Sequence, residues 1–220
     1  MSWKSNIFQN FKLYAITDLK SEDPDILSRV EKACRGGADI IQLRSKNLPD
    51  AALFRLGTSI REITLKNQKL FLMNDRPDLA LALKANGVHV GQDDLPVAVI
   101  RKLAGRRPFY IGKSTHSLEQ ALAAEQEGAD YIGVGPVFET PTKPGRAAVG
   151  LELVRQVRQN IKIPFVAIGG IDHNNVSQVL EAGAERIAVV RAVFGAANPY
   201  DATHKLREQI ENFSAAHARD

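Results

Sequence analysis

Gly128-Ala129-Asp130-Tyr131-Ile132-Gly133-Val134 is the stretch that decides the fold, because it ends one helical segment and opens an apolar strand. The same start, Gly-Ala followed by an acidic residue, recurs at residues 37–39 and 183–185, each time between a helical pattern and the next apolar run. Glycine readily adopts the left-handed conformation that closes a helix, and the chain then enters a strand at once. The recurrence predicts repeated helix-to-strand units within one domain.

Apolar, β-branched runs alternate with segments of period near 3.6 along the whole chain. The predicted strands, eight in number, cover residues 13–17, 39–43, 69–73, 87–90, 109–112, 131–135, 165–169 and 186–190. Strict alternation favours a parallel sheet, and eight units favour its closure into a barrel. The expected fold is therefore α/β, a single (β/α)8 TIM barrel over residues 1–220 with its core at about residues 12–212. The alternative is an open doubly wound sheet, which usually has a glycine-rich loop after its first strand, and Thr17-Asp18-Leu19 is not one.

Composition narrows the class of protein. Hydrophobic residues make up 44% and charged residues 25%, which is ordinary for a globular domain. The net charge of +4 comes from scattered lysines and arginines, so no nucleic-acid partner is expected. Neither a long apolar run nor a secretory leader is visible, so no membrane association is expected either. The single cysteine, Cys34, lies in an apolar helical pattern, which favours a buried structural role and a reducing cytoplasm.

Polar residues follow the predicted strands at their carboxyl ends, where barrels of this kind build their sites. After the second strand, alternation in an extended segment places Gln42, Arg44 and Lys46 on one side. An amide and two cations directed into one barrel mouth suit a polyanionic substrate. The alternative is an ordinary salt bridge at the rim of the barrel.

Carboxylates follow the third and fourth strands, as Asp75 after Asn74 and as Asp94 at the end of Gly91-Gln92-Asp93-Asp94. Facing carboxylates repel unless a cation lies between them, and oxygen ligands beside a phosphorylated substrate favour Mg²⁺. Asp75 and Asp94 are therefore the predicted metal ligands. The alternative is helix capping, because a proline follows each of them closely. Asp78 or Asp93 is expected to be a surface group only.

After the fifth strand, Ser114 is expected to direct a hydroxyl at the site, while Thr115 or Ser117 caps the next helix. His89 and His116 are weak acid–base candidates, since a hydrogen-bonded structural role explains them equally well. No Ser/His/Asp arrangement can be read from the sequence, so no residue is expected to act as nucleophile or as acid or base.

Two further connections are typical of phosphate binding. The longest, residues 136–149, carries Thr140, Thr142 and Lys143, and a loop of this length in a compact barrel is usually functional. Gly169-Gly170 follows the seventh strand and Val190-Arg191 follows the eighth, where such barrels often bind phosphate through backbone N–H groups. A tight turn without ligand is the alternative for the two glycines. The pattern indicates two anion sites, as joining two phosphorylated molecules requires.

Several motifs in register resemble the thiamine phosphate synthase family, from about residue 12 to residue 212. They are Gln42-Leu-Arg-Ser-Lys46, Asn74-Asp75, Gly87-Val-His-Val-Gly-Gln-Asp-Asp94, Gly133-Val-Gly-Pro-Val-Phe138, Thr140-Pro-Thr-Lys143 and Ala167-Ile-Gly-Gly-Ile171. The resemblance implies that a thiazole phosphate displaces pyrophosphate from 4-amino-5-hydroxymethyl-2-methylpyrimidine pyrophosphate in a dissociative, Mg²⁺-dependent reaction. The implied partners are thus two small molecules.

The resemblance also implies a role for each matching residue. The pyrophosphate would be held by Arg44, Lys46, Asn74 and Lys143, Mg²⁺ by Asp75 and Asp94, the pyrimidine by Gln42 and Ser114, and the thiazole phosphate by Thr140, Thr142, Gly170, Val190 and Arg191. Arg191 departs from the family pattern, which has serine there, so its backbone N–H is the expected contact. The rival within the same barrels is a thiazole tautomerase, which lacks the pyrophosphate and metal residues present here. Rivals outside it are a sugar-phosphate epimerase barrel and an inactive ligand- or RNA-binding protein.

Overall fold

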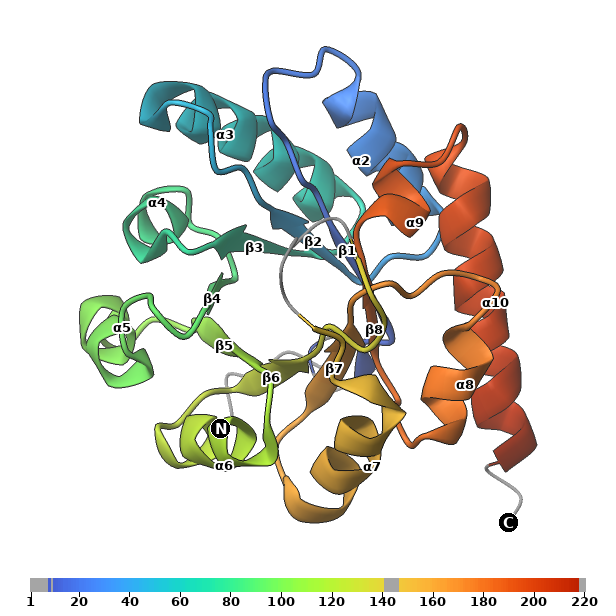
Figure 1. The fold of residues 1–220 in the computed structure, drawn as a ribbon. Coiled ribbons are helices and arrows are strands. Elements are labelled where there is room, and N and C mark those ends of the chain that lie inside the picture. The colour runs from blue at the N-terminus through green and yellow to red at the C-terminus, as the bar shows by residue number, and fades with distance from the viewer. Residues whose placement is uncertain (1–7, 9, 141–146, 218–220) are drawn as a thin grey trace.

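The chain forms a closed barrel of parallel strands in the order β1 to β8, with β1 paired to β8, as the sequence predicts (Figure 1). The computed structural model describes residue 8 and residues 10–140 and 147–217. The strands are β1 Leu13–Ile16, β2 Ile40–Leu43, β3 Leu70–Asn74, β4 Gly87–Val90, β5 Tyr110–Thr115, β6 Tyr131–Val134, β7 Phe165–Ile168 and β8 Ile187–Val189. The helices around them are α2 Ile26–Arg35, α3 Asp50–Lys66, α4 Pro77–Ala82, α5 Val97–Ala104, α6 Leu118–Gln126, α7 Gly150–Asn160, α8 Val176–Glu181, α9 Arg191–Phe194 and α10 Pro199–His217.

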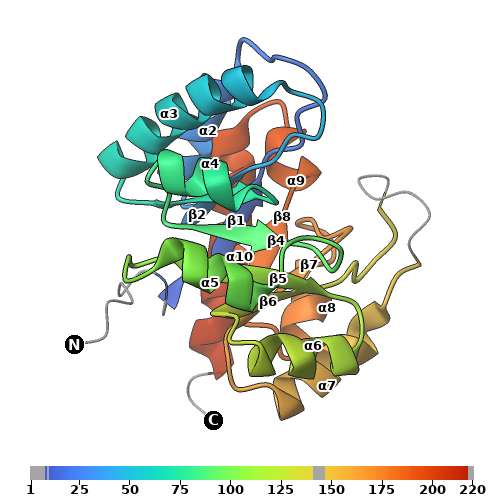
Figure 2. The same cartoon turned by 90° about the vertical axis from the view of Figure 1, so that its left-hand side faces the viewer.

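Helices surround the strands, so the barrel has an apolar layer outside and a separate packed interior (Figures 1 and 2). The predicted buried face of α2 is confirmed, because Ile26, Val30, Ala33 and Cys34 are all buried. Burial raises the pKa of the Cys34 thiol to about 12, consistent with a structural role. Among residues 10–140 and 147–217, no helix is long and apolar enough to cross a membrane.

The Gly-Ala-acid repeats act at the amino ends of the strands. Gly37, Gly128 and Gly183 have positive φ angles of 110°, 85° and 99°, which confirms the left-handed helix ends. The carboxylate of Asp39 then accepts hydrogen bonds from the amides of Lys12 and Leu13, at 2.7 and 3.1 Å. This acceptor fixes β2 against the start of β1.

Aromatic rings fill the amino-terminal half of the barrel interior. Phe8 stacks on Tyr110 with ring centroids 3.8 Å apart, and Phe11 packs edge-on against Tyr14 and Tyr131. Ile16, Ile40, Leu70, Leu72, Val166 and Ala188 belong to the same buried cluster. With this end closed by apolar packing, the open end lies at the carboxyl ends of the strands.

Strand β5 is longer than the sequence predicts, since it continues past Gly112 to Thr115. Ser114 pairs in register with Gly133 of β6, so it lies within the strand and not after it. Lys113, which precedes Ser114 in β5, faces outward and forms an ion pair with Glu127 at 2.8 Å. The sequence predicts that this strand ends at Gly112, because the residues that follow are polar. In the barrel these polar residues continue the strand, since both of its faces have polar partners there.

Candidate functional site

One cavity, called the main cavity because all strands contribute to it, opens at the carboxyl ends of the strands and has a volume of about 360 Å³, within the usual range for small-molecule sites. Every strand, or the loop that follows it, contributes to its wall. The lining includes Tyr14, Ile16, Gln42, Arg44, Asn74, His89, Ser114, His116, Gly133, Thr140, Ile168, Gly170, Val190 and Arg191. Of the predicted site residues, the cavity therefore brings together Gln42, Arg44, Asn74, Ser114, Thr140, Gly170, Val190 and Arg191.

The three polar residues Gln42, at the carboxyl end of β2, and Arg44 and Lys46, after it, line two adjoining cavities. Gln42 is buried and lines the main cavity, whereas Arg44 lines both that cavity and a second one of about 630 Å³. Lys46 is exposed and lines the second cavity only. The sequence predicts that Gln42, Arg44 and Lys46 lie on one side of the segment. In the structure Gln42 and Arg44 line the same cavity, and Lys46 lies farther out along the rim.

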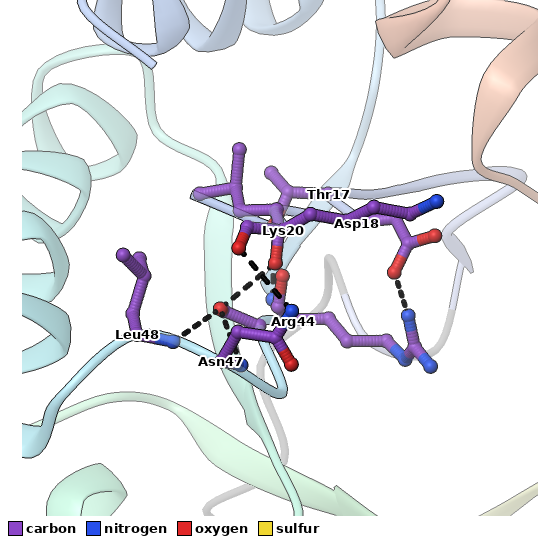
Figure 3. A network of polar contacts seen from close by, with 8 residues as sticks. Thr17, Asp18, Lys20, Arg44, Asn47 and Leu48 are labelled. Atoms are coloured by element: carbon purple, nitrogen blue, oxygen red, sulfur yellow. Dashed lines mark hydrogen bonds and ion pairs between the residues drawn. The ribbon is translucent and has the colours of Figure 1, made fainter. Parts of the chain in front are cut away.

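Arg44 is held by contacts with the segment that follows β1 (Figure 3). Its guanidinium forms an ion pair with Asp18, and its backbone N–H and C=O both bond the Thr17 hydroxyl, at 2.9 and 3.1 Å. The rim salt bridge considered as an alternative therefore exists, and it occupies the same guanidinium that faces the cavity. Sequence reasoning missed Asp18, although an acidic residue directly after the first strand was the available signal.

The carboxyl groups of Asp75 and Asp94 meet beside Asn74, as the sequence predicts. Burial and the neighbouring Asp94 carboxyl raise the pKa of Asp75 to about 6, while Asn74 and Lys46 act to lower it. The raised pKa indicates that ionising both carboxyl groups at once costs free energy.

The capping alternative for these two residues is wrong. The residues preceding α4 and α5 are Arg76 and Pro96, and neither helix has a side-chain cap. Asp75 adopts a left-handed φ of 59°, and Asp94 closes its own turn by accepting from the Gly91 amide at 2.6 Å. Both carboxyl groups are therefore positioned by loops and not spent on helix ends.

The predicted surface and capping residues are where the sequence placed them. Asp78 and Asp93 are exposed. Asp78 forms an ion pair with Arg76 at 2.7 Å. Ser117 caps α6 by accepting from the Gln120 amide at 3.3 Å, and Thr115 is buried in β5.

His89 and His116 are hydrogen-bonded within the barrel wall. His89 lies 2.9 Å from the Ser114 hydroxyl through Nε2 and 3.0 Å from the Tyr131 hydroxyl through Nδ1. His116 bonds the Gly135 carbonyl through Nδ1, and its backbone N–H donates to Gln120 Oε1 at 2.8 Å. These contacts support the structural interpretation, with Ser114 directed into the cavity as predicted.

Sequence reasoning missed Tyr14 and Tyr131, whose hydroxyls lie 3.1 Å apart inside the barrel. Tyr14 lines the cavity, and Gln42 donates to its hydroxyl. Burial raises the pKa of each phenol well above its ordinary value, so both keep their protons. Their place in alternating strand residues was the available signal, because it directs them to the interior.

The glycines after β7 lie against the long loop that follows β6. Gly169 and Gly170 have φ angles of 104° and 65°, and a Cβ on Gly170 would lie 2.7 Å from the Glu139 carbonyl oxygen. Asn175 donates to the Gly170 carbonyl at 2.8 Å. The tight turn of the alternative reading is present, and it also lines the cavity. A side chain at position 170 would meet the Glu139 backbone, so the space that glycine leaves serves loop packing.

Residues 190–191 lie where β8 passes into α9. Helix α9 begins at Arg191, and the first N–H groups of a helix have no partner within it. The Arg191 side chain is exposed and lines both cavities. Thr140 is half-buried in the cavity wall, whereas Thr142 and Lys143 lie outside the described residues.

With this geometry in view, comparison with known proteins assigns the family. Residues 13–193 match the family described as thiamine monophosphate synthase. The chain belongs to this family. A thiamine-phosphate synthase of Gloeobacter violaceus is 48% identical over 90% of the chain and 57% of the relative. One of Pyrococcus furiosus is 43% identical over 94% of the chain and 98% of the relative.

Solved structures agree with this assignment to the thiamine monophosphate synthase family. The thiamine phosphate pyrophosphorylase of Pyrococcus furiosus superposes with a TM-score of 0.85 at 41% identity, covering 94% of this chain and 99% of that one. A 3-hexulose-6-phosphate synthase superposes with a TM-score of 0.68 at 23% identity, a likeness of fold alone. The chain spans less than two thirds of the length of two of these relatives, 57% of the one from Gloeobacter violaceus and 59% of one from Synechocystis sp..

The paired carboxylates predict a particular dependence of stability on pH. The pKa of Asp75 is higher in the folded protein than in the unfolded chain, so protonation of Asp75 stabilises the fold. This stabilisation is complete below the unfolded pKa of 3.8 and is lost as pH rises through about 6. Asp94→Asn removes the like charge, so at pH 8 without divalent cation it should be more stable than wild type by about 1 kcal/mol after allowance for solvent screening.

Thermal unfolding between pH 3.5 and 8 measures this difference, which should vanish at the acidic end. Added Mg²⁺ should raise the unfolding temperature of wild type at pH 8 and that of Asp94→Asn much less. Parallel pH curves for the two proteins would show that the carboxyl groups do not interact.

Proposed function

We propose that the protein is a thiamine phosphate synthase. It would join 4-amino-5-hydroxymethyl-2-methylpyrimidine pyrophosphate to a thiazole phosphate, giving thiamine phosphate and pyrophosphate. The observation that carries the proposal is one cavity whose wall has an amide and hydroxyl part, a cationic part next to paired carboxylates, and a glycine-loop part. Membership of the thiamine monophosphate synthase family and relatives of that name support it.

The pyrimidine pyrophosphate would occupy the β2–β5 side of the cavity. Gln42 and Ser114 would contact the ring, and Arg44, Asn74 and Lys46, which line the two cavities, would hold the diphosphate. The Arg44–Asp18 ion pair supports this placement, because it holds the guanidinium at the cavity before any substrate arrives. Lys143, outside the described residues, would complete the cationic set.

Asp75 and Asp94 fit a bound Mg²⁺. In the part of the chain that the structure describes, no three His, Cys, Asp or Glu side chains gather as a metal site. Mg²⁺ commonly uses one or two carboxylates and takes its remaining ligands from substrate phosphates and water. The ion would neutralise charge that develops on the leaving pyrophosphate.

The thiazole phosphate would bind on the opposite side of the cavity. Gly170, Val190 and Arg191 line this side together with Thr140, and Thr142 outside the described residues would join them. Backbone N–H groups at the start of α9 support phosphate binding at Val190 and Arg191.

The proposed reaction depends on alignment of the two rings and on stabilisation of the leaving diphosphate, more than on proton transfer. The bond between the pyrimidine methylene carbon and the pyrophosphate oxygen breaks, and its electron pair leaves with pyrophosphate. The lone pair of the thiazole nitrogen then forms the new bond to that carbon. The side chains would hold both rings in line, shield the cation from water and stabilise the departing diphosphate. We place the reaction in the cytoplasm, since the one cysteine, Cys34, is buried and has no second cysteine in this chain to form a disulfide with.

The direct test incubates both substrates with the purified protein and Mg²⁺ and measures thiamine phosphate and pyrophosphate. Formation of both in equal amounts is the expected result. Turnover of the thiazole phosphate alone, without pyrimidine consumption, would instead indicate the tautomerase alternative.

The metal proposal predicts that Asp75→Asn loses most activity while the barrel stays folded. Losing stabilisation of the leaving group should cost about 2–4 kcal/mol, or roughly 30- to 1,000-fold in rate. Raised Mg²⁺ should restore part of the rate. Asp78→Asn is the matched control, because this exposed carboxylate lies three residues away. A wild-type rate for Asp75→Asn in chelator would contradict the assignment.

Arg44→Ala should slow the departure of pyrophosphate by about 30- to 1,000-fold, since one charge-assisted contact that strengthens in the transition state is lost. Single-turnover kinetics of the pyrimidine substrate measure this step. A change confined to thiazole affinity would show that Arg44 belongs to the other subsite.

Arg191→Ser should change thiazole-phosphate affinity by less than about tenfold, because the backbone N–H survives the substitution. Calorimetric titration of thiazole phosphate measures the affinity. A loss of roughly a hundredfold or more, about 2.8 kcal/mol, would mean that the guanidinium is the main contact.

A further inference from the structure

A continuous series of side-chain hydrogen bonds crosses the inside of the barrel. Gln42 on β2 donates to the hydroxyl of Tyr14 on β1, which lies 3.1 Å from the hydroxyl of Tyr131 on β6. Tyr131 lies 3.0 Å from Nδ1 of His89 on β4, and Nε2 of His89 lies 2.9 Å from Oγ of Ser114 on β5. We call these five residues the polar relay. Its two ends, Gln42 and Ser114, both line the main cavity.

The relay has a direction, set by the protons of its members. Burial keeps both phenols protonated, so each has one proton to donate. With Gln42 as the donor at one end, each contact receives one proton when Tyr14 donates to Tyr131 and Tyr131 donates to Nδ1 of His89. A neutral imidazole that accepts at Nδ1 carries its proton at Nε2 and donates it to Ser114.

The direction fixes what each end presents to the cavity. Gln42 turns its amide nitrogen to Tyr14, so its Oε1 remains as an acceptor. In this arrangement of protons Ser114 accepts from Nε2 of His89, 2.9 Å away, and its own proton remains as a donor. Reversing one end requires turning the amide, both phenols and the imidazole tautomer together. The two ends are thus coupled as one acceptor and one donor.

We propose that Tyr14, Tyr131 and His89 are positioning residues that select a ring with an amino group next to a ring nitrogen. This inference rests on the proposed function and names the ring edge that its pyrimidine subsite accepts. The amino group would donate to Gln42, and the ring nitrogen would accept from Ser114. A 4-oxo ring would set its oxygen against the Gln42 acceptor, and an unmatched buried pair of this kind is costly.

The barrel interior makes room for the relay. A Cβ on Gly112 would lie 2.1 Å from Cζ of Tyr131 and 2.5 Å from Nδ1 of His89. A Cβ on Gly133 would lie 3.2 Å from Cε1 of His89. Packing alone does not require this polarity, since phenylalanine fills almost the same space as tyrosine. Buried hydroxyls stabilise a core only when they are bonded, so the relay is better explained by what its ends do.

The test uses Tyr131→Phe, which removes one hydroxyl and keeps the ring. The quantity measured is the ratio of kcat/KM for the 4-amino pyrimidine pyrophosphate to that for its 4-oxo analogue. The ratio should fall by about tenfold or more in Tyr131→Phe, and similarly in Tyr14→Phe, because Gln42 and Ser114 then choose their orientations independently. Phe11→Leu is the control, since this ring packs on both tyrosines without a hydrogen bond to either, and its ratio should stay unchanged.

An independent readout is the imidazole tautomer of His89, observed by ¹⁵N NMR of the ligand-free protein. The proton should reside on Nε2 in wild type and be distributed over both nitrogens in Tyr131→Phe. An Nδ1–H tautomer in wild type overturns the relay, and so does an unchanged ratio of kcat/KM for the two pyrimidines in both tyrosine variants. The proposed function stands in either case. Absence of thiamine phosphate formation in wild type overturns the proposed function, and the assignment of the aminopyrimidine with it.

Discussion

Closure of the barrel by pairing of β1 with β8 is the constraint on which the site depends. Leu13 pairs with Ile187, Tyr14 with Ala188 and Ala15 with Val189, so the first and last strands share one hydrogen-bonded ladder. Closure brings the carboxyl ends of all strands to one rim, where residues far apart in sequence become neighbours. An open sheet would place Arg191, after β8, at the opposite edge from Arg44.

The two ends of the barrel have different physical characters, and function follows from that difference. At the amino end, rings such as Phe8 and Tyr110 stack and exclude water. Toward the carboxyl end, polar side chains enter the cavity wall from Gln42 on β2, His89 on β4 and Ser114 on β5. The tyrosine pair lies between these zones, with its rings in the apolar part and its hydroxyls in the polar part.

Two of the charged groups at the rim, Arg44 and Asp75, interact with neighbouring acidic side chains. Arg44 is paired with Asp18, and the raised pKa of Asp75 reflects a proton retained between two carboxyl groups. In the proposed reaction, a diphosphate would compete with Asp18 for the guanidinium, and Mg²⁺ would replace the proton.

The sequence by itself determined the barrel, the order of its elements and most of the lining, because strand alternation and the Gly-Ala-acid repeats are local signals. Local signals could not predict the extension of β5 through Ser114, because it depends on pairing with β6. Nor could they predict the uncapped starts of α4 and α5, which depend on loop geometry. Only the tertiary structure placed Tyr14 against Tyr131, 117 residues away, and Asp18 against Arg44. The physical reason is that a hydrogen bond across a barrel depends on strand register and ring orientation, which no pattern along one strand encodes.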